Sequence, residues 1–322
     1  MTSAFTRALN CEMWAVDPPP GRFPGLRRPP AGFPPGRPPV AARARRAARC
    51  SAREARPPRD RTRRVIRTAA RQDLPSLRAL FARSNDAPYP LELVAEEKCF
   101  GDGIGGAPVV RVYGDFLGAA VTCGKWLRIL VVDREARRRG IGSALLADSN
   151  AQVIFAEPGN YFTPGVWAKD ESTLAFFRKH GYAEKARTWN LEVPLTEEPR
   201  NRGTEEPNAR VLSFIEQHFG RIWRFESSRA RGIVISETNG EITGFAAYEA
   251  NNRGLGVFGP TGVAKPLRGR GIGRELLLAA LAELRALGYE RAIIPWTDAL
   301  AFYRKSCGAE PAHEFIALNS GP

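Results

Sequence analysis

The chain has 322 residues, of which 43% are hydrophobic, and this is enough for about two domains with cores of their own. Its net charge of +14 is unevenly distributed. Residues 1–64 hold 15 Arg, no Lys and 4 acidic residues, a net of +11, whereas the remainder carries only +3. No run approaches the roughly 18 apolar residues of a membrane span. We therefore expect a cytoplasmic protein with neither a membrane partner nor a specific nucleic-acid partner.

The cysteines and histidines exclude two further classes. No CxxC pair occurs, and the three histidines lie far apart in the sequence. The odd, scattered set of cysteines predicts free thiols in a reducing compartment, and no metal site is expected. The cysteines are Cys11, Cys50, Cys99, Cys123 and Cys307.

Residues 1–64 form a tail rich in Pro and Arg that contains 12 of the 26 prolines. Proline lacks a backbone N–H donor, and the arginines repel one another, so the composition predicts disorder. The Arg content is typical of a transit peptide, but the prolines would break the required helix. A nonspecific anion-binding tail, a plain extension and a start codon placed too early remain open.

From residue 65 the pattern becomes that of an α/β domain, assigned to residues 65–195. A helix is predicted from an N-cap at Asp73 through Phe81. Further helices are predicted at 141–146 and 172–180, and strands at 65–68, 108–113, 117–122, 127–132 and 188–193.

A polar, proline-containing linker is predicted at 196–208, followed by a second domain at 209–322. An amphipathic helix carrying Leu277, Leu281 and Leu284 ends at Gly288. Other helices are predicted at 209–219 and 299–305, and strands at 233–236, 242–248, 255–263 and 292–296.

The two domains share an internal repeat. The run RRRGIG at 137–142 recurs 131 residues later as RGRGIG at 268–273. Val132 and Val263 precede these loops by the same spacing. The run FFRK at 176–179 recurs as FYRK at 302–305. Several matches at nearly constant offset predict two copies of one α/β domain.

The repeated loop suits a phosphate group. In each copy a strand leads through Arg and Gly to a helix, whose first N–H groups carry partial positive charge. The arginines add charge for the same ligand. A plain packing turn is the alternative, and the recurrence argues against it. The separate GxGxxG at 101–106 follows an acidic, helix-like stretch, so we expect a loop there.

On these loops the sequence resembles the GCN5-related N-acetyltransferase (GNAT) superfamily, whose acetyl-CoA motif is [R/Q]xxGx[G/A]. The resemblance covers about 65–195 and 209–318. It implies an α/β fold of two tandem domains, each a mixed, mostly antiparallel sheet flanked by helices, with acetyl-CoA as cosubstrate and no metal. The segments YFTPGV at 161–166 and IPWT at 294–297 are similar to tandem enzymes acting on amino sugars.

The resemblance also implies site residues. Tyr303 would protonate the departing thiolate, whereas the first copy has Phe177, so the C-terminal copy is expected to be catalytic. Glu249, Asp298 or a relayed water would act as the base. The cofactor-binding residues would be Val263, Arg268, Gly269, Arg270, Gly271, Ile272 and Gly273, with Val132, Arg137, Arg138, Arg139, Gly140, Ile141 and Gly142 as their counterparts.

The function expected from the resemblance is transfer of an acetyl group to a primary amine of a small molecule such as an amino sugar. The alternative is a non-catalytic acyl-CoA-binding or regulatory protein whose basic tail contacts nucleic acid. The sequence gives neither the acceptor nor the oligomeric state, because variable loops build the acceptor pocket.

Deleting residues 1–64 should leave folding and acetyl transfer nearly unchanged, because the tail has little apolar periodicity to add to a core. Thermal unfolding and turnover of the shortened chain, measured beside the full chain, check this. A large loss of either would make the tail a structural or substrate-binding part.

Overall fold

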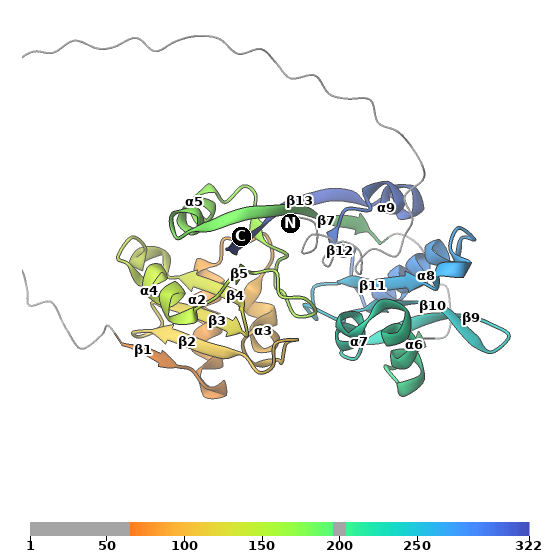
Figure 1. Cartoon of the computed structure of the whole chain (residues 1–322), viewed down its shortest axis with the longest axis horizontal. Coiled ribbons are helices and arrows are strands. Elements are labelled where there is room, and N and C mark those ends of the chain that lie inside the picture. The colour runs from red at the N-terminus through yellow and green to blue at the C-terminus, as the bar shows by residue number, and fades with distance from the viewer. Residues whose placement is uncertain (1–64, 196–203, 322) are drawn as a thin grey trace, which may run out of the picture. The chain divides into compact units, whose positions relative to one another are not determined.

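The computed structural model describes residues 65–195 and 204–321 (Figure 1). The predictions for residues 1–64 and for most of the linker, 196–203, lie outside the described residues. The end of the predicted linker that is described contains a short strand, β8 (Thr204–Glu205), which pairs with β9.

The N-terminal half follows the predicted order, with additional short elements. Asp73 occupies the predicted N-cap position of α2, but its carboxylate accepts the Ala70 N–H and pairs with Arg67 instead of capping the helix. The helices are α2 (Leu74–Ser84), α3 (Ala95–Phe100), α4 (Ile141–Ser149) and α5 (Glu171–Lys179). The strands are β1 (Ile66–Thr68), β2 (Val109–Tyr113), β3 (Gly118–Cys123), β4 (Trp126–Val132), β5 (Val153–Ile154), β6 (Val166–Trp167) and β7 (Tyr182–Pro194).

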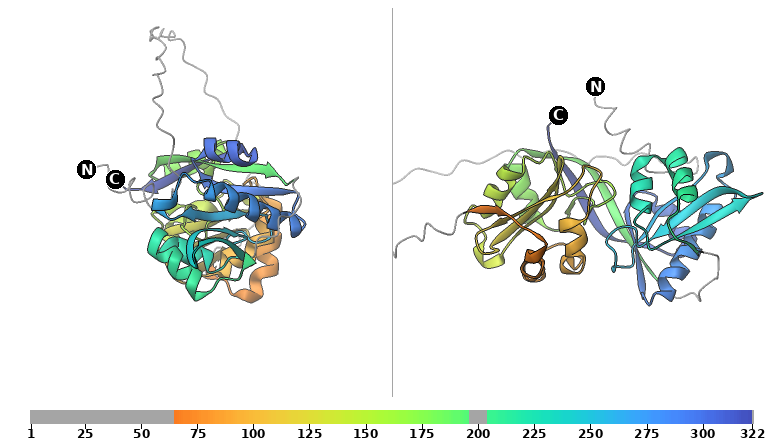
Figure 2. Two further views of the ribbon diagram at one scale, coloured as in Figure 1. Left: turned by 90° about the vertical axis from the view of Figure 1, so that its right-hand side faces the viewer. Right: turned by 90° about the horizontal axis from the view of Figure 1, so that it is seen from below.

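The C-terminal half repeats this order and ends in a strand that the sequence patterns did not predict. Its helices are α6 (Ala209–Phe219), α7 (Arg221–Ser227), α8 (Ile272–Ala286) and α9 (Leu300–Cys307). Its strands after β8 are β9 (Gly232–Thr238), β10 (Glu241–Tyr248), β11 (Phe258–Val263), β12 (Arg291–Thr297) and the unpredicted β13 (Glu310–Ser320). Both halves therefore have the expected mixed sheets flanked by helices (Figure 2).

The two long strands β7 and β13 are exchanged between the halves. They run antiparallel side by side (Figure 1). Strand β13, from the C-terminal half, lies between β5 and β7, and β7, from the N-terminal half, lies between β13 and β12. Leu318 is paired with Ile154, and Leu191 is paired with Ile294. One nine-stranded sheet therefore spans both halves, and β8–β11 form a separate four-stranded sheet.

The exchanged strands also enter the opposite cores. Ile316 and Leu318 of β13 pack in the cluster that contains Leu145 of α4. Leu191 and Val193 of β7 pack in the cluster built on α8. Because an exchanged strand carries apolar side chains into the other half, hydrophobic burial couples the folding of the two halves.

Removing β13 by ending the chain at Ala309 should abolish cooperative folding of both halves. Phe315, Ile316 and Leu318 are almost fully buried, and each contributes about 1.5–3 kcal/mol by burial, a sum comparable with a whole domain's stability. Circular dichroism and calorimetry on the truncated chain check this. The milder Leu318→Ala should cost about 2–5 kcal/mol. A truncated chain that retained one native-like transition would show that the N-terminal half folds without β13.

Candidate active site

The two Arg/Gly loops have the same backbone geometry. Gly140 and Gly271 adopt left-handed conformations, with φ of 83° and 86°, and the next residues begin α4 and α8. Among the described residues, no N-cap side chain bonds to the first N–H groups of either helix. Both helix starts therefore offer backbone donors and partial positive charge to an anion.

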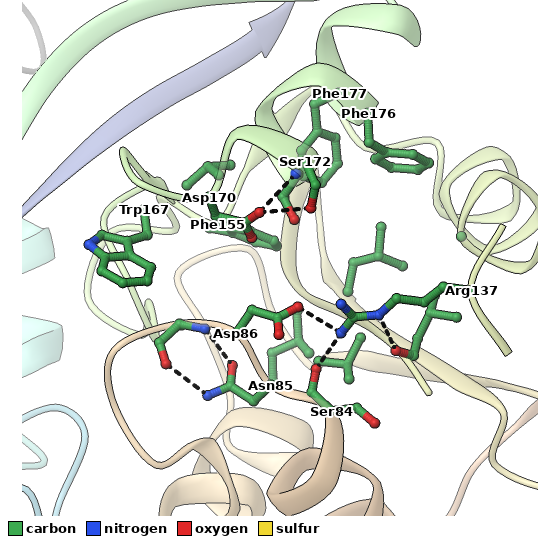
Figure 3. Close-up of a pocket in the computed structure, with 18 of the residues that line it drawn as sticks. Ser84, Asn85, Asp86, Arg137, Phe155, Trp167, Asp170, Ser172, Phe176 and Phe177 are labelled. Carbon is green, nitrogen blue, oxygen red and sulfur yellow. Dashed lines mark hydrogen bonds and ion pairs between the residues drawn. The ribbon is translucent and has the colours of Figure 1, made fainter. Parts of the chain in front are cut away.

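The first arginine of each loop fastens the loop to its strand. Arg137 Nε donates to the Val132 carbonyl at 3.1 Å, and Arg268 Nε donates to the Val263 carbonyl at the same distance. Arg137 also pairs with Asp86 at 2.6 Å (Figure 3). Arg138 and Arg270 are exposed beside the helix starts. The first arginine shapes the loop, and the exposed ones supply free positive charge.

The last glycine of each loop faces equivalent neighbours. A Cβ on Gly142 would lie 3.5 Å from Val132 and Phe176, and a Cβ on Gly273 would lie 3.6 Å from Val263. Phe302, the repeat partner of Phe176, lies 3.9 Å from that same Gly273 position. The internal repeat therefore extends from sequence to side-chain packing.

Beside each loop, neighbouring strands separate. Strands β4 and β5 pair only at their first residues, Trp126 and Leu127 with Val153 and Ile154. Between β11 and β12 the pairing is limited to one bridge, which immediately precedes β11. The later residues of β4 and β11 consequently leave that edge of their backbone available to a ligand.

A large cavity lies in this opening of the N-terminal half. It has a volume of about 750 Å³ and extends from the loop at 137–143 along β4 to α5 (Figure 3). Phe155, Phe162, Trp167 and Phe176 make much of its wall apolar. Such a cavity has the size and character of a small-molecule or cofactor site.

The acidic groups of this cavity are already engaged. Asp86 pairs with Arg134 at 3.1 Å as well as with Arg137. Asp170 caps α5, accepting from the Ser172 hydroxyl and the Thr173 N–H. Phe177, at the position matching Tyr303, offers no proton donor. This cavity provides space and apolar surface, with its carboxylates held in structural contacts.

The C-terminal half has a smaller cavity of about 80 Å³ in the corresponding opening. Its walls come from β11, from β12 and from α7, with Trp223 and Trp296 among the lining side chains. The segment 158–161 of the N-terminal half forms a further wall, including Tyr161, whose ring lies edge-on to Trp296. Both halves therefore build this cavity.

Tyr303 lies in the wall of the smaller cavity. Its ring packs edge-on to Phe258, with centroids 6.2 Å apart. Burial raises the pKa of Tyr303 well above the usual value for a phenol, so the hydroxyl keeps its proton at neutral pH. A protonated hydroxyl at a cavity wall is able to serve as a proton donor.

The two predicted base residues do not line the smaller cavity, although burial and then the charge of Asp298 are among the causes that raise the pKa of Tyr303. The Glu249 carboxylate is fully buried and accepts hydrogen bonds from the N–H groups of Gly254, Gly256 and Val257 and from the Tyr289 hydroxyl. Asp298 is exposed after β12. The geometry gives Glu249 a structural role in its loop.

Sequence reasoning missed the acidic residue that does line this cavity. Glu226 belongs to the short helix α7, which the patterns did not predict. A signal existed in the spacing: Trp223, Glu226 and Ser227 share the buried face of that helix. A glutamate on an apolar helix face is unusual and indicates a special environment.

Within residues 65–195 and 204–321, no helix is long and apolar enough to cross a membrane. The same ranges contain no cluster of three or more His, Cys, Asp or Glu side chains suited to a metal ion.

Comparisons with known families match both halves. Residues 194–309 match the acetyltransferase (GNAT) family, and residues 91–184 match a family described as acetyltransferase (GNAT) domain. No curated protein sequence matches the chain.

Solved structures share the fold at low sequence identity. A GCN5-related glucosamine N-acetyltransferase region of a fungal multi-domain GH3 beta-N-acetylglucosaminidase is similar over 79% of this chain, with TM-score 0.61 and 16% identity. The match spans only 38% of that longer protein. A GNAT protein from Sphaerobacter thermophilus has TM-score 0.55 and 19% identity, covering 80% of this chain and 96% of its own. A tandem GNAT protein from the clavulanic acid biosynthesis pathway has TM-score 0.56 and 17% identity. The match covers 80% of this chain and 99% of that protein.

Proposed function

We propose a specific reaction from the premise that this chain belongs to the GCN5-related N-acetyltransferase superfamily, with two GNAT domains in tandem. The chain transfers an acetyl group from acetyl-CoA to a primary amine of a small molecule. The observation that carries the proposal is the smaller cavity, where Tyr303 lies beside the opening between β11 and β12.

The C-terminal loop suits the pyrophosphate of acetyl-CoA. Free N–H groups at the start of α8 and the exposed guanidinium of Arg270 would hold that group. The unpaired edge of β11, ending at Val263, would receive the pantetheine chain. When bound, acetyl-CoA supplies the thioester carbonyl that the amine attacks. Tyr303 would donate its proton to the departing sulfur.

The cavity volumes support a second role for the N-terminal half. Its loop is complete and its cavity is large, but Phe177 replaces the tyrosine. We assign acyl-CoA binding without transfer to this half, which retains part of the non-catalytic alternative. The acetyl transfer itself is assigned to the half that contains Tyr303.

An assay of CoA release with a panel of primary amines tests the proposed reaction. D-glucosamine is a reasoned first acceptor, because one structure of the same fold is described as a glucosamine N-acetyltransferase region. Acetylated product should appear in proportion to released CoA. Binding of acetyl-CoA without product from any amine would favour the non-catalytic alternative.

Exchanging Gly271 for glutamate should sharply weaken acetyl-CoA binding at the working site and remove turnover. At φ of 86° a side chain is strained by about 1–2 kcal/mol, and a carboxylate would repel the pyrophosphate. Gly140→Glu is the matched control, because both glycines have open space around a Cβ. Turnover that survived Gly271→Glu but was lost in Gly140→Glu would move the reaction to the N-terminal half.

Replacing Tyr303 with phenylalanine should lower turnover by roughly 10²–10⁴-fold if its hydroxyl is the acid. Both kcat and kcat/KM should fall, because the interaction is made in the transition state. Acetyl-CoA affinity and thermal stability should change little, since the ring remains. Tyr289→Phe is a control that removes a hydroxyl bonded to Glu249, away from the cavity. Unchanged kinetics where chemistry limits the rate would remove Tyr303 from the mechanism.

A further inference from the structure

We infer that Glu226 and the aromatic side chains around it form the subsite for the acceptor amine, with the Glu226 carboxylate accepting a proton from the substrate ammonium. This inference rests on the proposed function, because it places the amine beside Tyr303. The subsite would bind a small cationic amine in the smaller cavity, at the junction of the two halves.

Glu226 differs from the other buried glutamates of the described residues. The Glu157 carboxylate accepts hydrogen bonds from Arg128 Nε at 2.6 Å and from Arg128 Nη2 at 2.9 Å. Glu249 accepts four hydrogen bonds. Glu226 is 8% exposed, and within the described ranges no hydrogen bond or ion pair engages its carboxylate. A buried carboxylate facing a cavity without such partners is placed to receive a ligand.

The rest of the wall suits an ammonium group. Trp223, Trp296 and Tyr161 line the same cavity as Glu226. Aromatic faces attract cations, tryptophan most strongly. Trp296 has φ of 50°, a left-handed conformation that is rare for a bulky residue. Its backbone N–H donates to Asn190 Oδ1 at 2.9 Å, so the fold maintains this strained position in the cavity wall.

Burial, modified by nearby charges, sets the proton affinity of Glu226. Burial raises its pKa to about 7, while Arg229 and Lys98 oppose the rise and Glu97 adds to it. Lys98 is occupied by Glu97 at 2.7 Å and by Asn160 at 2.9 Å. The Arg229 guanidinium donates to the Gly159 carbonyl. These two cations favour the charged form of Glu226 without a hydrogen bond or ion pair to its carboxylate in the described ranges. A base with this pKa works well near neutral pH.

The proton balance of the reaction then closes. The bound ammonium loses one proton to the Glu226 carboxylate and becomes a nucleophilic amine. The amine nitrogen forms a bond to the thioester carbon, and the carbon–sulfur bond breaks. The sulfur receives a proton from the Tyr303 hydroxyl, which regains it from the nitrogen. The products are the amide and CoA thiol, and Glu226 later releases its proton to solvent.

Glu226→Gln tests the catalytic part at nearly constant volume. We expect kcat/KM for D-glucosamine to fall by roughly 10²–10⁴-fold, with acetyl-CoA affinity retained. In the native chain kcat/KM should decline as pH falls through about 7, because the raised pKa protonates Glu226 there. That decline should be absent in Glu226→Gln. Added formate should partly restore the turnover of Glu226→Ala. Glu216→Gln is the control, since Glu216 is exposed on α6 and pairs with Arg224.

A binding measurement separates this inference from the proposed function. Calorimetry with D-glucosamine at pH 8 should show affinity lower by roughly tenfold or more in Glu226→Gln than in the native chain. An active native chain with an unchanged Glu226→Gln variant would overturn the role of Glu226 and leave the proposed function intact. A native chain without transfer to any amine would overturn the proposed function, and the calorimetric comparison would still decide the subsite: equal affinity overturns it, and weakened affinity supports it.

Discussion

The exchange of β7 and β13 is the constraint on which the rest of the structure depends. Strand β13 lies beside β5, and β7 lies beside β12, so strands of both halves form one nine-stranded sheet next to a separate four-stranded sheet of β8–β11. Because β13 pairs with both β5 and β6, it also fixes the segment between those two short strands. That segment contains Pro158, Gly159 and Tyr161, which form one wall of the cavity in the C-terminal half. The exchange therefore serves both folding and the construction of the site.

A buried ion pair holds this segment from the other side. Arg128 and Glu157 are almost completely buried, and Arg128 also donates to the carbonyls of Lys98 and Gly101. Burying two charges is costly unless their remaining donors and acceptors are satisfied, as they are here. A Cβ on Gly103 would lie 1.6 Å from Glu157, which explains physically why a glycine stands in the GxGxxG run. Arg128 borders the larger cavity, so one ion pair connects the walls of both.

Sequence patterns predicted the features that depend on local spacing. The Arg/Gly loops, the helices that follow them and most strands lie where periodicity and the repeat placed them. Strand β13 was not predicted because His313 and Glu314 interrupt its apolar pattern. No local sequence signal indicates which half of the chain a strand will pair with. Helix α7 has only seven residues, too few for a clear period. Glu226 was missed with it, whereas Glu249 was chosen although its loop N–H groups occupy the carboxylate.

The two halves have diverged in complementary directions. Phe177 is completely buried against Phe155 and Tyr182, so the first copy uses this position for packing beside a wide, apolar cavity. Tyr303 keeps a hydroxyl in the wall of a narrow cavity that is also lined by the Glu226 carboxylate. A wide cavity favours binding a large ligand, whereas a narrow one brings reacting groups together and excludes water. Two copies of one domain thus carry cavities of different size and different lining within one chain.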